Sequence, residues 1–223
     1  MIRPALLAAL LALSAAPAHA LEDAEEARVA APLPRLFPHR DSYLELDPEA
    51  RSHFTLTYMI SSDRGVPPEE IRMWYEHGGD RVELEIAESG LIANPPPAEA
   101  LEAAPDLWIN QPEGGMSMTM QFAYGGPVST QYTSSDLRTG LEQANRAIRH
   151  AAGVAALFAP NFKTVRFIFE DAAPEAFAVT EDGERRPLTV QENLALFRPG
   201  DRANRDVVRV EFGREPARVL FDS

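Results

Sequence analysis

The chain has 223 residues, no cysteine and a formal net charge of −13 at pH 7, and 45% of its residues are hydrophobic. This hydrophobic fraction is typical of globular proteins and excludes a wholly disordered chain. The absence of Cys excludes disulfides, thiolate metal sites and cysteine nucleophiles. The negative charge argues against nucleic acid or an anionic membrane surface as a partner, because both require a basic face.

The first 20 residues have the pattern of a secretory signal peptide. Arg3 provides a positive start, residues 5–15 form an apolar run interrupted only by Ser14, and residues 18–20 have a small-x-small cleavage pattern. An apolar run of about a dozen residues is too short for a membrane anchor, which needs about twenty. We therefore predict cleavage after Ala20, which leaves a net charge of −14. The Arg-rich and Ala-rich composition suggests a bacterial genome, so we expect a soluble periplasmic protein without stable membrane insertion.

The part of the chain before residue 127 is expected to consist of a lead-in and a β unit. Residues 21–50 are predicted to be an extended, Pro-containing lead-in, because prolines at positions 32, 34 and 38 fix φ and lack an amide donor. Residues 51–126 are predicted to form an antiparallel β-sandwich-like unit, with short strands about ten residues apart. The expected strands are 53–61, 71–76, 81–87, 107–110 and 116–124. Glycine pairs at 78–79 and 114–115 predict two hairpins, and residues 98–104 a short helical turn.

Residues 127–223 are predicted to form an α+β unit, with the boundary at the loop 125–127. A helix is expected over 133–158, because apolar residues recur there at spacings of three and four and Thr133 with Asp136 resembles a capping box. Strands are expected at 163–170, 176–190, 207–212 and 219–221, the second being a hairpin that turns at Asp182 and Gly183. The predicted fold class is α+β: a β-sandwich-like unit followed by a helix packed on a small antiparallel sheet.

Residues 71–95 combine a strand, a Gly-Gly turn, an alternating strand and a run of prolines. This pattern resembles the transthyretin-like sandwiches found beside exported enzymes. The whole chain, with its signal peptide, β unit, helix over 137–155 and strand over 162–169, resembles exported proteobacterial proteins that have no assigned activity. The resemblance implies the architecture and transfers no functional residue.

Motifs of catalysis are missing from the sequence. It contains no G-x-S-x-G, H-E-x-x-H, S-x-x-K or phosphate-binding glycine loop. The histidines are isolated in sequence, and the plentiful carboxylates fall on strand faces expected to be solvated. We therefore predict no catalytic residues and no cofactor. Because a Ser-His-Asp triad is defined by geometry and can be assembled from distant positions, an atypical hydrolase stays as the weakest alternative.

Three methionines, Met116, Met118 and Met120, alternate along one predicted strand and share one of its faces. The pattern resembles the M-x-M-x-M stretches of periplasmic copper-handling proteins, in which soft sulfur selects Cu(I). The competing interpretation is that these thioethers fill an irregular core. Further ligands for such a site would come from Met59, Met73, His53 or His77.

Trp74 and Trp108 fall on neighbouring strands, where exposed rings would bind sugar or peptide and buried rings would anchor the sandwich. The leading hypothesis is a non-catalytic periplasmic protein that serves as an envelope interaction or structural module. Its partner would be an envelope protein or a cell-envelope component. The alternative is a Cu(I)-handling protein that uses Met116, Met118 and Met120.

Overall fold

The structure is a computed structural model that describes residues 27–153 and 159–223. The predicted signal peptide and the last residues of the predicted helix, 154–158, lie outside these ranges. Within the described ranges, no helix is both long and apolar enough to span a membrane.

A six-stranded antiparallel sheet runs through the molecule in the order β11-β12-β8-β14-β6-β2. Its strands are β11 (Thr189–Gln191), β12 (Leu194–Phe197), β8 (Thr164–Ile168), β14 (Arg218–Asp222), β6 (Met116–Tyr124) and β2 (Phe54–Ser62). Strands β2 and β6 precede the predicted boundary at residues 125–127 and the other four follow it, so sequences from both sides share one sheet.

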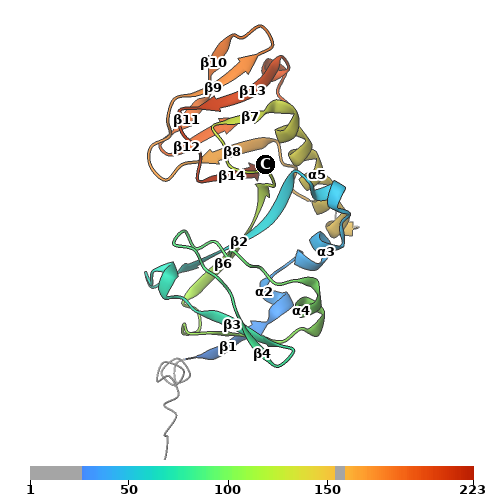
Figure 1. Cartoon of the computed structure of the whole chain (residues 1–223), viewed down its shortest axis with the longest axis vertical. Coiled ribbons are helices and arrows are strands. Elements are labelled where there is room, and N and C mark those ends of the chain that lie inside the picture. Colours follow the sequence, from blue (N-terminus) through green and yellow to red (C-terminus); the bar gives the residue numbers. More distant parts are fainter. Residues whose placement is uncertain (1–26, 154–158) are drawn as a thin grey trace, which may run out of the picture.

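Two four-stranded antiparallel sheets complete the β structure. The first has the order β1-β5-β3-β4, with β1 (Arg28–Pro32), β5 (Asp106–Ile109), β3 (Met73–His77) and β4 (Asp80–Glu83). The second has the order β10-β9-β13-β7, with β10 (Arg185–Pro187), β9 (Ala176–Thr180), β13 (Val207–Phe212) and β7 (Gln131–Thr133). In Figure 1 these two sheets occupy opposite ends of the molecule, and the long strands β2 and β6 run between them.

The one long helix in the described ranges, α5 (Ser134–Ala152), packs on β13 and β7 of the second small sheet and also contacts β2. Its N-terminus is capped as predicted, because the Thr133 side chain accepts a hydrogen bond from the Asp136 amide. The α+β class, with antiparallel sheets and a helix on a small sheet, is confirmed. The short helices are α2 (Leu33–Leu36), α3 (Arg40–Glu45), α4 (Ala98–Ala103) and the 3-10 turns η1 (Pro48–Arg51), η2 (Pro68–Glu70) and η4 (Arg202–Asn204).

A single hydrophobic cluster joins all three sheets and α5. The predicted alternation of β2 is confirmed, since Phe54, Leu56, Tyr58 and Ile60 are all buried on one face. In an antiparallel pair, directly opposite residues point to the same face. The register of β2 with β6 therefore divides the six-stranded sheet into an inner face, which includes Tyr58 and its partner Met120, and an outer face.

Two sequence predictions are wrong. Residues 107–110 and 116–124 do not form a hairpin: β5 joins the first small sheet and β6 pairs with β2 and β14. The lead-in is not simply extended, because α2 and α3 are helical. Helix α2 tolerates Pro34 because proline in the first helical turn withholds an amide that has no partner inside the helix anyway.

Candidate functional site

Met116, Met118 and Met120 lie on the inner face of β6, opposite Ser62, Ile60 and Tyr58 of β2. All three side chains are half-buried and pack against the hydrophobic cluster. The Cα atoms of neighbouring methionines in this row are about 7 Å apart, because every second residue of a strand is on the same face. This placement accounts for the three methionines as core packing.

The residues that the sequence suggested as further ligands are dispersed. Met59 is opposite Thr119 and therefore on the outer face, the wrong side for the three methionines. Met73 is buried in the first small sheet, and His77 ends strand β3 at the tight turn before β4. His53 lies beside the first turn of α5, where its Nε2 is 3.8 Å from an Asp136 oxygen.

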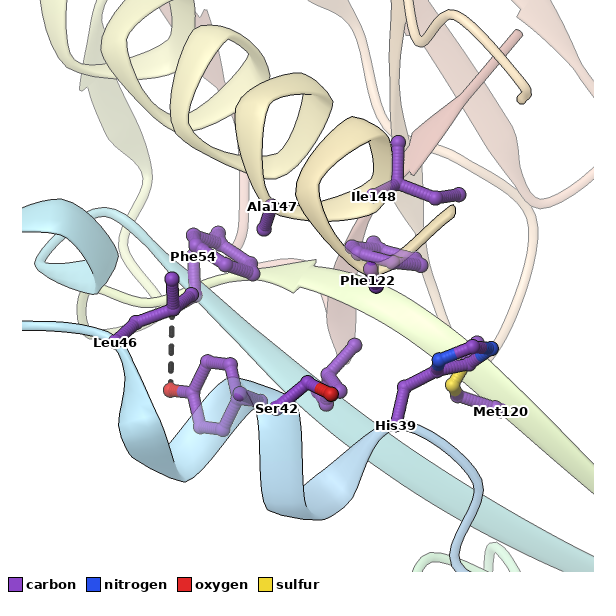
Figure 2. A pocket seen from close by; sticks show the side chains of 11 residues that line it. His39, Ser42, Leu46, Phe54, Met120, Phe122, Ala147 and Ile148 are labelled. Atoms are coloured by element: carbon purple, nitrogen blue, oxygen red, sulfur yellow. Dashed lines mark hydrogen bonds between the residues drawn. The ribbon is translucent and has the colours of Figure 1, made fainter. Parts of the chain in front are cut away.

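A histidine that the sequence did not single out is brought close to Met120. His39 and Met120 line a small pocket of about 50 Å³ between α3, the β2–β6 pair and the end of α5. Figure 2 shows the His39 ring beside the Met120 thioether, with Ser42 pointing into the same space. The rest of the lining is almost entirely apolar and includes Phe122 and Ile148. A pocket of this size has room for an ion or a few water molecules.

Within the described residues, Ser52, His53 and Asp136 form a Ser-His-Asp grouping, whose hydrogen bonds give it a structural role that we call the lock. Ser52 Oγ is 2.9 Å from His53 Nδ1, but the 3.8 Å between His53 Nε2 and Asp136 exceeds hydrogen-bond length. The Ser52 hydroxyl donates to the Glu49 carbonyl and accepts from the Gln143 amide. Buried Gln143 also receives the His53 backbone N–H and donates to the Glu49 carbonyl, both at 2.8 Å. These bonds attach η1 and the start of β2 to α5.

The two tryptophans anchor the first small sheet. Trp74 and Trp108 are direct partners between β3 and β5, with ring centroids 6.5 Å apart and an interplanar angle of 11°. The Arg81 guanidinium lies 3.9 Å from the centroid of the Trp74 ring. Trp74 is only 7% exposed as a result, so its ring is covered and does not offer a free platform for a sugar.

A wide concave feature lies on the outer face of the six-stranded sheet. Two cavities, of about 500 and about 140 Å³, share Arg218 as a lining residue, and we call them together the Arg218 groove. Strands β2, β6 and β14 supply its floor, and the loop of residues 65–68 with Ser89 and Leu91 borders it. Gly90 fixes this border, because φ is +82° there and a Cβ would lie 2.2 Å from the Ile60 carbonyl oxygen.

Arg218 crosses the floor of the groove without a carboxylate partner in the described part of the chain. Its Nη1 donates to the Met59 sulfur and, at 3.4 Å, to Gln121 Oε1, and no other side-chain hydrogen bond of Arg218 is found among the described residues. Burial lowers the pKa of the Arg218 guanidinium, and the positive charge of Arg166 lowers it further. Arginine nevertheless stays charged in proteins. The groove therefore holds a half-buried cation with unused donors.

Of the two neighbouring arginines Arg166 and Arg218, only Arg166 has a carboxylate partner among the described residues. Arg166 lies on the adjoining strand β8 and is paired with Asp222 of β14 at 3.2 Å. Among the residues that line the groove there is no His, Asp, Glu or Lys. The sequence did not indicate this site, because an arginine at the start of a short strand carries no motif.

Comparisons with known proteins add no assignment: no family model matches the chain, and no curated protein or solved structure matches it significantly.

Proposed function

We propose that the protein is exported to the periplasm and acts there as a non-catalytic interaction module of the cell envelope. The signal-peptide pattern of residues 1–20 supports export, and the single observation that carries the interaction role is the Arg218 groove. The groove has a volume of several hundred Å³, which is typical of ligand sites. It also holds a cation, Arg218, some of whose N–H donors have no acceptor among the described residues.

The composition of the groove favours binding over turnover. General acid–base catalysis needs a group that gains and loses a proton near the working pH, usually His, Asp, Glu or Lys. None of these residue types lines the groove, and Arg218 stays protonated. The groove can hold a ligand but supplies no base to activate a nucleophile.

Two measurements test the proposal. Cell fractionation followed by mass spectrometry of the N-terminus should find the protein in the periplasm, starting at Leu21; a chain that keeps residues 1–20 in the cytoplasm would contradict export. The purified protein should show no turnover on a broad panel of ester, amide and glycoside substrates. Turnover that the Ser52→Ala substitution abolishes would instead establish the hydrolase alternative.

A second candidate function, Cu(I) handling, is favoured by one specific observation: His39 lies beside Met120 in the pocket of Figure 2. Met120 and Met118 share one face of the sheet. Thioether and imidazole are ligands that suit Cu(I). Anaerobic titration with Cu(I) decides the matter, with the triple substitution of Met116, Met118 and Met120 by Leu as the comparison. Equal binding by the two proteins would remove this candidate, and tight binding lost in the triple variant would support it.

A further inference from the structure

We propose that the Arg218 groove binds a small monocarboxylate that carries an apolar group, with the guanidinium of Arg218 pairing with the carboxylate. This inference deepens the proposed binding function and rests on it. It names the chemical class of the ligand, which is a carboxylate head joined to an aliphatic tail.

An anionic head follows from the unpaired charge. A charged group that is withdrawn from water is costly unless it is paired or hydrogen-bonded. Among the described residues, the side chain of Arg218 donates only to the Met59 sulfur and the Gln121 amide oxygen, in both cases through Nη1. A guanidinium has five N–H donors, so Nε and Nη2 stay available. A planar carboxylate is the acceptor whose geometry matches this fork, with two parallel hydrogen bonds.

A single negative charge follows from the local charge balance. Among the described residues, Arg166 is the cation whose charge lowers the pKa of Arg218, and Arg166 is itself paired with Asp222 at 3.2 Å. The net charge offered to a ligand is therefore that of one guanidinium. The polar side chains beside it are uncharged and include Thr119, Gln121 and Ser89. A phosphate dianion would bring twice the charge that the groove can balance, whereas a carboxylate matches it.

The apolar part of the ligand follows from the smaller cavity. Arg218 lies between a more polar cavity and one whose lining is largely aliphatic and includes Leu91, Ala123, Val128 and Leu220. Val128 is 49% exposed, more than any other large hydrophobic residue in the described chain. Covering this surface removes apolar area from water, and that is the usual driving force for binding a hydrocarbon.

Sodium octanoate is the probe, because it joins a carboxylate to an unbranched chain. Isothermal titration against the full mature protein, at an ionic strength of about 0.15 M where the screening length is about 8 Å, limits repulsion from the acidic remainder of the surface. We expect saturable binding of octanoate, weaker binding of octyl phosphate, and none of octylamine or acetate. Failure of octanoate to bind, or tighter binding of octyl phosphate, would overturn the proposed ligand class.

The Arg218→Gln substitution tests the site. It should raise the Kd for octanoate about tenfold or more, the effect of removing a charge-assisted pair. Arg202→Gln is the matched control, because Arg202 is exposed on η4, outside the groove, and its loss should leave the Kd unchanged. Arg218→Lys keeps the charge but loses the fork, and we expect an intermediate Kd. Equal Kd values for the wild type and both Arg218 variants would place octanoate elsewhere and refute the site.

The tail is tested by Val128→Ser, which should weaken octanoate binding while the unfolding temperature stays that of the wild type. Unchanged affinity would refute the aliphatic cavity as the tail site. These outcomes are separable from failure of the proposed function: absent octanoate binding with no enzymatic turnover overturns only the ligand class, whereas turnover overturns the interaction module itself.

Discussion

Gly140 provides a test in which two physical effects oppose each other. It lies inside α5, where replacement by Ala normally stabilises a helix by about 1 kcal/mol. Here, however, a Cβ at residue 140 would lie 2.6 Å from the His53 carbonyl oxygen and 2.6 Å from Cζ of Phe221. We expect the Gly140→Ala substitution to destabilise the protein despite the gain in helix propensity.

The size of this loss of stability depends on how far the His53 carbonyl and the Phe221 ring can move. The His53 carbonyl is backbone and accepts a hydrogen bond from the Gly125 amide at 3.0 Å, so moving it strains a second contact. Phe221 is only 6% exposed and is held in the core. Overpacking costs about 1–3 kcal/mol, and these constraints place Gly140→Ala at the upper end. After subtracting the helix gain, the net loss is about 2 kcal/mol, which lowers the Tm by roughly 4–8 °C in a chain of this size.

Thermal unfolding followed by circular dichroism at 222 nm measures this shift. The control is Gly200→Ala, where a Cβ meets no atom within 4 Å and φ is outside the left-handed region, so stability should change by less than about 0.5 kcal/mol. A Tm for Gly140→Ala equal to or above that of the wild type would refute close packing of α5 on the start of β2 and on β14.

Three further predictions concern the lock, the helix cap and pH. Gln143→Ala removes three hydrogen bonds and leaves the half-buried His53 amide without its partner, so the free energy of unfolding in urea should fall by about 2–4 kcal/mol. Gln191→Ala, at an exposed position, should leave the urea midpoint unchanged, and equal shifts for the two variants would contradict the lock. Thr133→Ala should cost about 1 kcal/mol by loss of the helix cap, with Thr133→Ser retaining most of the stability; full stability of the Ala variant would contradict this role. Burial raises the pKa of Tyr132 from 10.0 to about 12, so the stability that its neutral phenol provides is complete below pH 10 and is lost as the pH rises toward 12. The urea midpoint should therefore fall across this range, less steeply in Tyr132→Phe, and a flat profile would contradict the raised pKa.

The elements that sequence could predict are those whose signal is local. Strand β2 and helix α5 were predictable because each has a periodic apolar face over nine or more residues, and α5 has its cap beside it. The turn at residues 112–115 is also real, since the Gly115 amide donates to the Pro112 carbonyl. Turn residues determine where the chain reverses, but they do not choose the partner of the next strand. Strand β6 pairs along all nine of its residues with β2, a partner that the four-residue β5 cannot replace.

The groove could not be predicted for the same reason. Arg218 reaches Met59 across 159 positions of sequence and Gln121 across 97. The position of β14 between β6 and β8 leaves no pattern in the local sequence. The same holds for the pairing of Arg166 with Asp222. For the same reason, His39 and Met120 come together only through the docking of α3 on the β2–β6 pair.

The position of β14 has a consequence for the order in which the protein folds. This strand is the last in the described sequence, yet it lies inside the six-stranded sheet, between β6 and β8. The edge of β6 and the edge of β8 that face β14 therefore have no partner until residues 218–222 are in place. The two halves of the sheet are thus joined late. Contacts over such long separations slow folding, because the loop entropy is lost before the contacts form. Deleting β14 would therefore divide the central sheet between β8 and β6 instead of shortening it at one edge.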